Sequence, residues 1–181
     1  MKMKLEQKVK QLGINRVLVA DDRTENLIMA VKYFETLKSI GIEADFAGSE
    51  KQAIEKLEEN ARKNSYYDLV LSDMQMEDKK SGLNVARCGF KNLAFSFIVT
   101  TGCGHNGRTT EIEPRVGTIS GAKSEDGVWE QVLEKSLESL TGEGAENLAE
   151  VYKSFRRYKE FIGKPSDRIA ETMMWSYIEL E

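Results

Sequence analysis

Three acidic residues follow short apolar runs, in positions that suggest shared chemistry. Asp21 and Asp22 come directly after the run 16–20, and Asp73 closes the segment that begins with the run 67–71. Both runs are rich in β-forming residues and too short for helices, so each is predicted to be a buried strand. If these strands are parallel neighbours, the three carboxylates lie at the same edge of one sheet.

The elements that must position these acids alternate along the chain. Strands are predicted at 16–20, 42–47, 67–73, 95–100 and 116–122, and helices at 25–40, 49–61, 82–91 and 126–140. This alternation favours a parallel sheet with helices on both faces, because right-handed crossovers leave no other compact arrangement. The predicted fold class is therefore α/β, a doubly wound five-stranded parallel sheet with the flavodoxin-like strand order 2-1-3-4-5.

In that strand order, the first and third strands flank the switch point where ligands bind. Three carboxylates in one crevice would repel and raise one another's pKa, so a hard cation is the natural partner. Mg²⁺ fits best, because it accepts a few carboxylates and keeps waters and phosphate oxygens as its other ligands. Thr100 and Lys123, at the ends of the fourth and fifth strands, add a hydroxyl donor and a positive charge. The set suits phosphoryl transfer to a carboxylate.

Four motifs at strand ends resemble the receiver domains of two-component response regulators. They are Val17–Asp22, Asp68–Asp73, Ile98–Thr100 and Gly121–Lys123, and the resemblance covers about residues 15–140. The resemblance implies a phosphorylated Asp73, a Mg²⁺ site formed by Asp21, Asp22, Asp73 and the backbone carbonyl of Gln75, a switch hydroxyl on Thr100 and a phosphoryl-contacting Lys123. It also implies a phosphorelay protein that is not an enzyme, with a histidine kinase or phosphotransfer protein as donor and an unknown output protein as partner.

Four positions differ from the usual receiver pattern. Family members usually have proline at the positions of Glu77 and Ser124, a small residue at Thr101 and an aromatic residue at Ser120. These differences favour an alternative, a pseudo-receiver that acts as a protein interaction module without being phosphorylated.

A glycine-rich segment, 102–107, matches the dinucleotide fingerprint and raises a third alternative, a nucleotide-binding enzyme. The fingerprint should open a helix after the first strand, whereas this segment follows the fourth strand and no helical apolar stripe comes after it. We interpret it as a loop. Cys88, Cys103 and His105 lack zinc-like spacing, so we expect packing cysteines and a loop histidine.

The flanking segments are predicted to be helical. Residues 1–14 form an N-terminal helix, 15–140 the receiver-like domain and 141–181 a helical hairpin extension. The hairpin carries an apolar stripe, so we expect it to pack on the receiver or on a second copy, which would form a homodimer through the C-terminal helices.

Composition excludes several classes of protein. The chain has 181 residues and a formal net charge of −4, which argues against general binding to nucleic acid or to a membrane surface. No apolar run is long enough to span a bilayer, and the first residues lack a signal core, so we expect a cytoplasmic protein.

Overall fold

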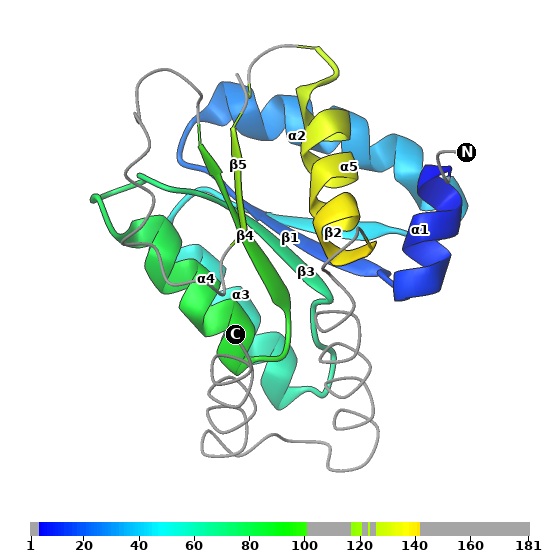
Figure 1. Ribbon diagram of the computed structural model, residues 1–181. Helices are drawn as coiled ribbons and strands as arrows, with labels where there is room; N and C mark the ends of the chain where they lie inside the picture. The colour runs from blue at the N-terminus through cyan, green and yellow to red at the C-terminus, as the bar shows by residue number, and fades with distance from the viewer. Residues whose placement is uncertain (1–3, 101–116, 121–122, 124–125, 142–181) are drawn as a thin grey trace, which may run out of the picture.

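A five-stranded parallel sheet forms the centre of the computed structural model, which describes residues 4–100, 117–120, 123 and 126–141 (Figure 1). Its strands are β1 (Arg16–Ala20), β2 (Glu43–Ala47), β3 (Leu69–Asp73), β4 (Phe95–Thr100) and β5 (Gly117–Ser120). The strand order is β2-β1-β3-β4-β5, and all neighbours are parallel. The predicted parallel α/β fold is confirmed, with the order 2-1-3-4 for the first four strands.

Helices cover both faces of the sheet. They are α1 (Leu5–Leu12), α2 (Thr24–Leu37), α3 (Glu50–Arg62), α4 (Ser81–Lys91) and α5 (Val128–Thr141), with a 3₁₀ turn η1 (Lys38–Ile40) after α2. Figure 1 shows α2 and α5 on one face and α3 and α4 on the other, each pair packed on its own hydrophobic cluster. The inner strands β1 and β3 are therefore enclosed on both faces, which explains why they begin as apolar runs rather than alternating.

The register of the sheet brings the ends of β1 and β3 together. Ala20 pairs with Ser72, so the residues that follow them, Asp21 and Asp73, emerge at the same edge. On the other side of β3, Asp73 pairs with Val99 of β4. The backbone register of the sheet alone therefore brings Asp21 and Asp73 to the same edge.

The N-terminal helix α1 belongs to the core. Val9 and Leu12 are buried in the same hydrophobic cluster as Leu133 and Leu137 of α5. Lys8 adds a salt bridge, in which its Nζ lies 3.0 Å from Oε1 of Glu138. The helix therefore fills the space beside α5, a role that its amphipathic sequence alone did not reveal.

Several predicted features lie outside the described residues. These are the glycine-rich segment 102–107 with Cys103 and His105, and the C-terminal hairpin. Cys88 does lie within the described part, where burial raises the pKa of its thiol to about 11, as expected of a packing cysteine. Among the described residues, no helix combines the length and apolar character that crossing a bilayer requires.

The packing of α1 leads to a stability prediction. Leu12→Ala removes a side chain that is only 6% exposed, and should lower the unfolding free energy by about 2–4 kcal/mol through lost burial and a residual cavity. Urea unfolding followed by circular dichroism measures this change. Lys10→Ala on the exposed side of α1 is the control and should have little effect. If the urea concentration at the midpoint of unfolding is the same for Leu12→Ala and the wild type, packing of α1 does not stabilise the core.

Candidate functional site

Asp21, Asp22 and Asp73 form an acidic cluster at the carboxyl edge of β1 and β3. Each offers a carboxylate oxygen, and these oxygens all lie within 4.8 Å of one another. Asp21 is fully buried, Asp73 is partly buried and Asp22 is exposed. Two like charges at such a distance repel by on the order of 3 kcal/mol at an effective dielectric constant of about 20. The cluster therefore needs positive charge nearby.

Lys123, in the connection between β5 and α5, supplies one positive charge. Its Nζ donates a hydrogen bond to Oδ2 of Asp21 at 2.7 Å and another to Oδ1 of Asp73. The Lys123 side chain is 1% exposed, and a buried ammonium is tolerable only when it is paired in this way. With three carboxylates and one ammonium, the cluster keeps an excess of negative charge.

Asp21 is held by donors from the first turn of α2 as well. Its Oδ1 accepts hydrogen bonds from the backbone N–H of Arg23 and from Nδ2 of Asn26, both at 3.0 Å, and Nδ2 of Asn26 also lies 3.1 Å from Oδ2. These donors and Lys123 make full burial of the carboxylate acceptable. The negative charge also lies favourably at the N-terminus of α2.

Asp22 has a different environment from Asp21. Desolvation raises the pKa of its carboxyl above the usual value, and the negative charges of Asp21 and Asp73 raise it further. The ionised form of Asp22 is thus disfavoured by its own neighbours, which is the electrostatic condition that a bound cation relieves. Asp22 and Asp73 are the more accessible carboxylates of the cluster.

The start of α4 packs directly against the backbone of Asp73. Gly82 donates its backbone N–H to the carbonyl of Met74 at 3.1 Å. A Cβ on Gly82 would lie 1.9 Å from the carbonyl oxygen of Asp73, so only glycine permits this approach. Gly82 thereby helps to set the position of the backbone that carries Asp73.

The loop between β3 and α4 contains Gln75 and Glu77. Gln75 is exposed two residues after Asp73, at the start of this loop. The carboxylate of Glu77 accepts hydrogen bonds from the backbone N–H of Glu50, at 3.0 and 3.1 Å, and so caps the first turn of α3. The residue that replaces the usual proline of receivers therefore ties the loop to a neighbouring helix.

Of Thr100, the remaining predicted site residue, the structure describes the backbone but not the side chain. Thr100 ends β4, where its backbone pairs with Ser120 of β5. The side chains of Thr100 and Ser120, and the whole of Thr101 and Ser124, lie outside the described part of the chain. The cluster that the structure brings together therefore consists of Asp21, Asp22, Asp73 and Lys123.

Sequence reasoning missed two residues that shape this cluster, Asn26 and Gly82. Asn26 left a readable signal, because it lies on the same helical stripe as Ala30, Phe34 and Leu37, all of which are buried. A polar residue on an apolar stripe has to find a hydrogen-bond partner. The tight approach at Gly82 depends on contacts between distant segments and left no such signal.

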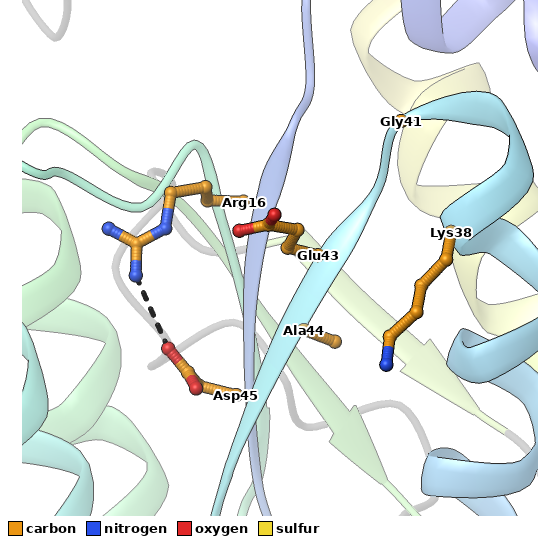
Figure 2. Close-up of a pocket in the computed structure, with 6 residues that line it drawn as sticks. All are labelled: Arg16, Lys38, Gly41, Glu43, Ala44 and Asp45. Carbon is orange, nitrogen blue, oxygen red and sulfur yellow. Dashed lines mark hydrogen bonds and ion pairs between the residues drawn. The ribbon is translucent and has the colours of Figure 1, made fainter.

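A hollow of about 520 Å³ lies beside β2 (Figure 2). It is lined by Arg16, the first residue of β1, whereas the acidic cluster follows the last residue of that strand. Among the described residues, three of the four charged side chains that line the hollow, all but that of Glu43, form ion pairs. Arg16 forms an ion pair with Asp45 at 3.3 Å, and Lys38 forms one with Glu35 at 2.7 Å. The hollow therefore presents little unmet charge to a ligand, and the acidic cluster remains the candidate site.

Comparison with known proteins identifies the class of fold. No protein-family model matches the sequence, and neither does any curated protein. Among solved structures, a response regulator receiver protein from Sinorhizobium medicae matches with a TM-score of 0.50 and 17% identity, over 71% of this chain and 98% of that one. The fold is that of response-regulator receiver domains.

Two further solved structures match at lower TM-scores. A CheY-like receiver domain protein from Methanospirillum hungatei has a TM-score of 0.46 and 21% identity, over 67% of this chain and 90% of that one. The response regulator domain of Thermotoga maritima CheB has a TM-score of 0.46 and 17% identity, over 71% of this chain and 94% of that one.

The contact between Gly82 and Asp73 generates a prediction. Gly82→Ala should lower the unfolding free energy by at least about 2 kcal/mol, because the added methyl group overlaps the Asp73 carbonyl and the backbone has to move. Gly48→Ala is the matched control, since a Cβ there meets only ordinary contacts of 3.7 Å and 3.9 Å. Chemical denaturation of both variants measures the difference. Equal stability of the two would refute the tight approach at Gly82.

Proposed function

We propose that this chain is a two-component signalling receiver that accepts a phosphoryl group on Asp73 in a Mg²⁺-dependent reaction. One observation carries the proposal: Lys123 bridges Asp21 and Asp73 inside a cluster that still has excess negative charge. A buried ammonium beside a partly accessible carboxylate is suited to phosphoryl transfer, which depends mainly on positioning and charge stabilisation.

Mg²⁺ fits the residues of the cluster. Three carboxylate oxygens within 4.8 Å of one another are the hard ligands that this ion prefers, and desolvation followed by the charges of Asp21 and Asp73 raises the pKa of Asp22. Asp21, Asp22 and Asp73 would hold the ion together with the backbone carbonyl of Gln75. When bound, it would supply positive charge that offsets the charge of the incoming phosphoryl group.

The side chains of the chain itself would carry out the transfer. A carboxylate oxygen of Asp73 forms the new bond to phosphorus while the bond from phosphorus to the leaving group breaks, and that group departs with the bonding electron pair. Lys123 already touches Asp73 and would stabilise the negative oxygens of the phosphoryl group. The hydroxyl of Thr100 would donate a hydrogen bond to the same oxygens, as the resemblance to receivers implies.

The proposal also defines partners and segments. The phosphoryl donor would be a histidine kinase or a phosphotransfer protein, and an output protein would recognise the modified receiver. The chain would catalyse nothing beyond its own phosphorylation and dephosphorylation. Residues 15–140 would form the receiver, and the segment 141–181 would pack on it or join two copies.

A second candidate function is a pseudo-receiver that serves as an interaction module. The observation that favours it is that Lys123 pairs with both Asp21 and Asp73, so that its ammonium offsets part of the repulsion between these carboxylates. The commitment of Glu77 to the first turn of α3 is a further departure from the usual receiver loop. In this function the acids would maintain the structure rather than accept phosphate.

Acetyl phosphate distinguishes the two functions. In the presence of Mg²⁺ it should phosphorylate the wild-type protein, and intact-mass spectrometry with rapid quenching should detect the adduct, which EDTA should prevent. Asp73→Asn should abolish the adduct, because an amide cannot act as the nucleophile. Asp78→Asn, in the exposed loop that follows, is the matched control and should still be modified. Mg²⁺ binding without an adduct, and without a response to beryllofluoride, would favour the pseudo-receiver.

Lys123→Ala separates the roles of lysine and metal. The variant should still bind Mg²⁺, because the carboxylates remain, but its rate of phosphorylation should fall at saturating Mg²⁺ since the ammonium acts on the phosphoryl group. Titration calorimetry gives the affinity and mass spectrometry gives the rate. A rate equal to that of the wild type would remove Lys123 from the proposed mechanism.

A further inference from the structure

Asn26 lies between the acidic cluster and the first turn of α5. Its side chain is part of the cluster, since Nδ2 donates to Oδ1 of Asp21 at 3.0 Å and lies 3.1 Å from Oδ2. Its backbone carbonyl accepts a hydrogen bond from Nε1 of Trp129 at 3.1 Å. One residue of α2 thus binds both a carboxylate of the cluster and a side chain of α5.

The start of α5 is consequently tied to the cluster by two routes. Lys123 reaches Asp21 and Asp73 from the connection that leads into α5. Trp129, the second residue of α5, reaches Asn26, which in turn holds Asp21. The two routes meet at Asp21 and form a closed ring of contacts, with the neighbouring helices α2 and α5 on one face of the sheet (Figure 1).

Packing alone does not account for the residue type at position 26. Asn26 is 2% exposed and lies on the buried face of α2, where the other buried residues are apolar. An apolar side chain would suit that face, and a buried amide is destabilising unless its polar atoms are hydrogen-bonded. The amide group points its donors at Asp21, so its hydrogen bonds serve the cluster.

We propose that Asn26 is a positioning residue that orients Asp21 against Lys123 and transmits a change of charge at Asp73 to Trp129 and the first turn of α5. A change of charge on Asp73 alters its attraction for Lys123, and Asp21 shares that ammonium. Asp21 then redistributes its hydrogen bonds between Lys123 and Asn26, which holds Trp129. The biological meaning of this link rests on the proposed receiver function, in which phosphorylation is the change of charge.

The indole N–H signal of Trp129 in a ¹H–¹⁵N NMR spectrum tests the link directly. The measurement is made without metal or phosphoryl donor, in a Trp175→Phe background, because the chain has two tryptophans. Asp73→Asn removes the negative charge at this position, a change opposite in sign to phosphorylation, and by weakening the attraction for Lys123 it should displace the Trp129 signal. When Asn26→Leu is also present, most of that displacement should be lost, because leucine keeps a similar volume and has no donor for Asp21.

Two further variants control for packing and for general loss of an amide. In the Asn26→Ala background, Asp73→Asn should displace the Trp129 signal as little as it does in the Asn26→Leu background. The alanine variant replaces the leucine variant if the latter does not fold. Asn60→Ala removes an amide that donates to the carbonyl of Lys56 and to the hydroxyl of Tyr67, away from the cluster. This variant should retain the full displacement.

Two results would overturn the proposal. One is a Trp129 signal that does not respond to Asp73→Asn. The other is a displacement that is as large in the Asn26→Leu and Asn26→Ala backgrounds as it is when Asn26 is present, which would assign the coupling to Lys123 and the connecting chain alone. Because no phosphoryl donor is used, a protein that fails to become phosphorylated can still show the coupling, and a phosphorylated protein can lack it.

Discussion

The buried ammonium of Lys123, placed between Asp21 and Asp73, is the interaction on which the site depends. It joins the connection before α5 to the ends of β1 and β3, and it makes the close approach of two carboxylates acceptable. Removing one partner of such a buried pair usually costs about 3–5 kcal/mol, because the remaining charge is left unpaired. The lysine is thus a structural tie as well as a candidate for phosphoryl binding.

Short-range packing around this bridge limits how the site can vary. Gly82 allows α4 to start against the carbonyl of Asp73, and Glu77 attaches the intervening loop to α3. On the other side, Asn26 and the backbone of Arg23 bind Asp21 from the first turn of α2. The starts of α2 and α4 therefore lie against Asp21 and Asp73, while α3 holds the loop that follows Asp73.

Much of the fold was predictable because local patterns agree with the tertiary structure. The apolar runs before Asp21 and Asp73 are strands, and the stripe of α3 packs on the sheet as expected. In α2, Phe34 and Leu37 are buried as expected, whereas Ile28 and Val31 of the same predicted stripe are exposed. Ser49 caps α3 in the structure, since its Oγ accepts a hydrogen bond from the backbone N–H of Gln52, and serine is a residue type favoured at such positions. The integration of α1 into the core was not predictable, since an amphipathic stripe shows that a helix needs a partner without showing which one.

The sequence by itself determined the parallel α/β fold and the presence of Asp21, Asp22 and Asp73 at one edge of the sheet. Strand periodicity and the crossover rule are local and topological constraints, so they can be read from one chain. Only the tertiary structure decided that Lys123 bridges two of the acids, that Asn26 links Asp21 to Trp129, and that Gly82 lies against Asp73. Those contacts join residues from separate elements, and their partners are set by three-dimensional packing rather than by spacing in the sequence.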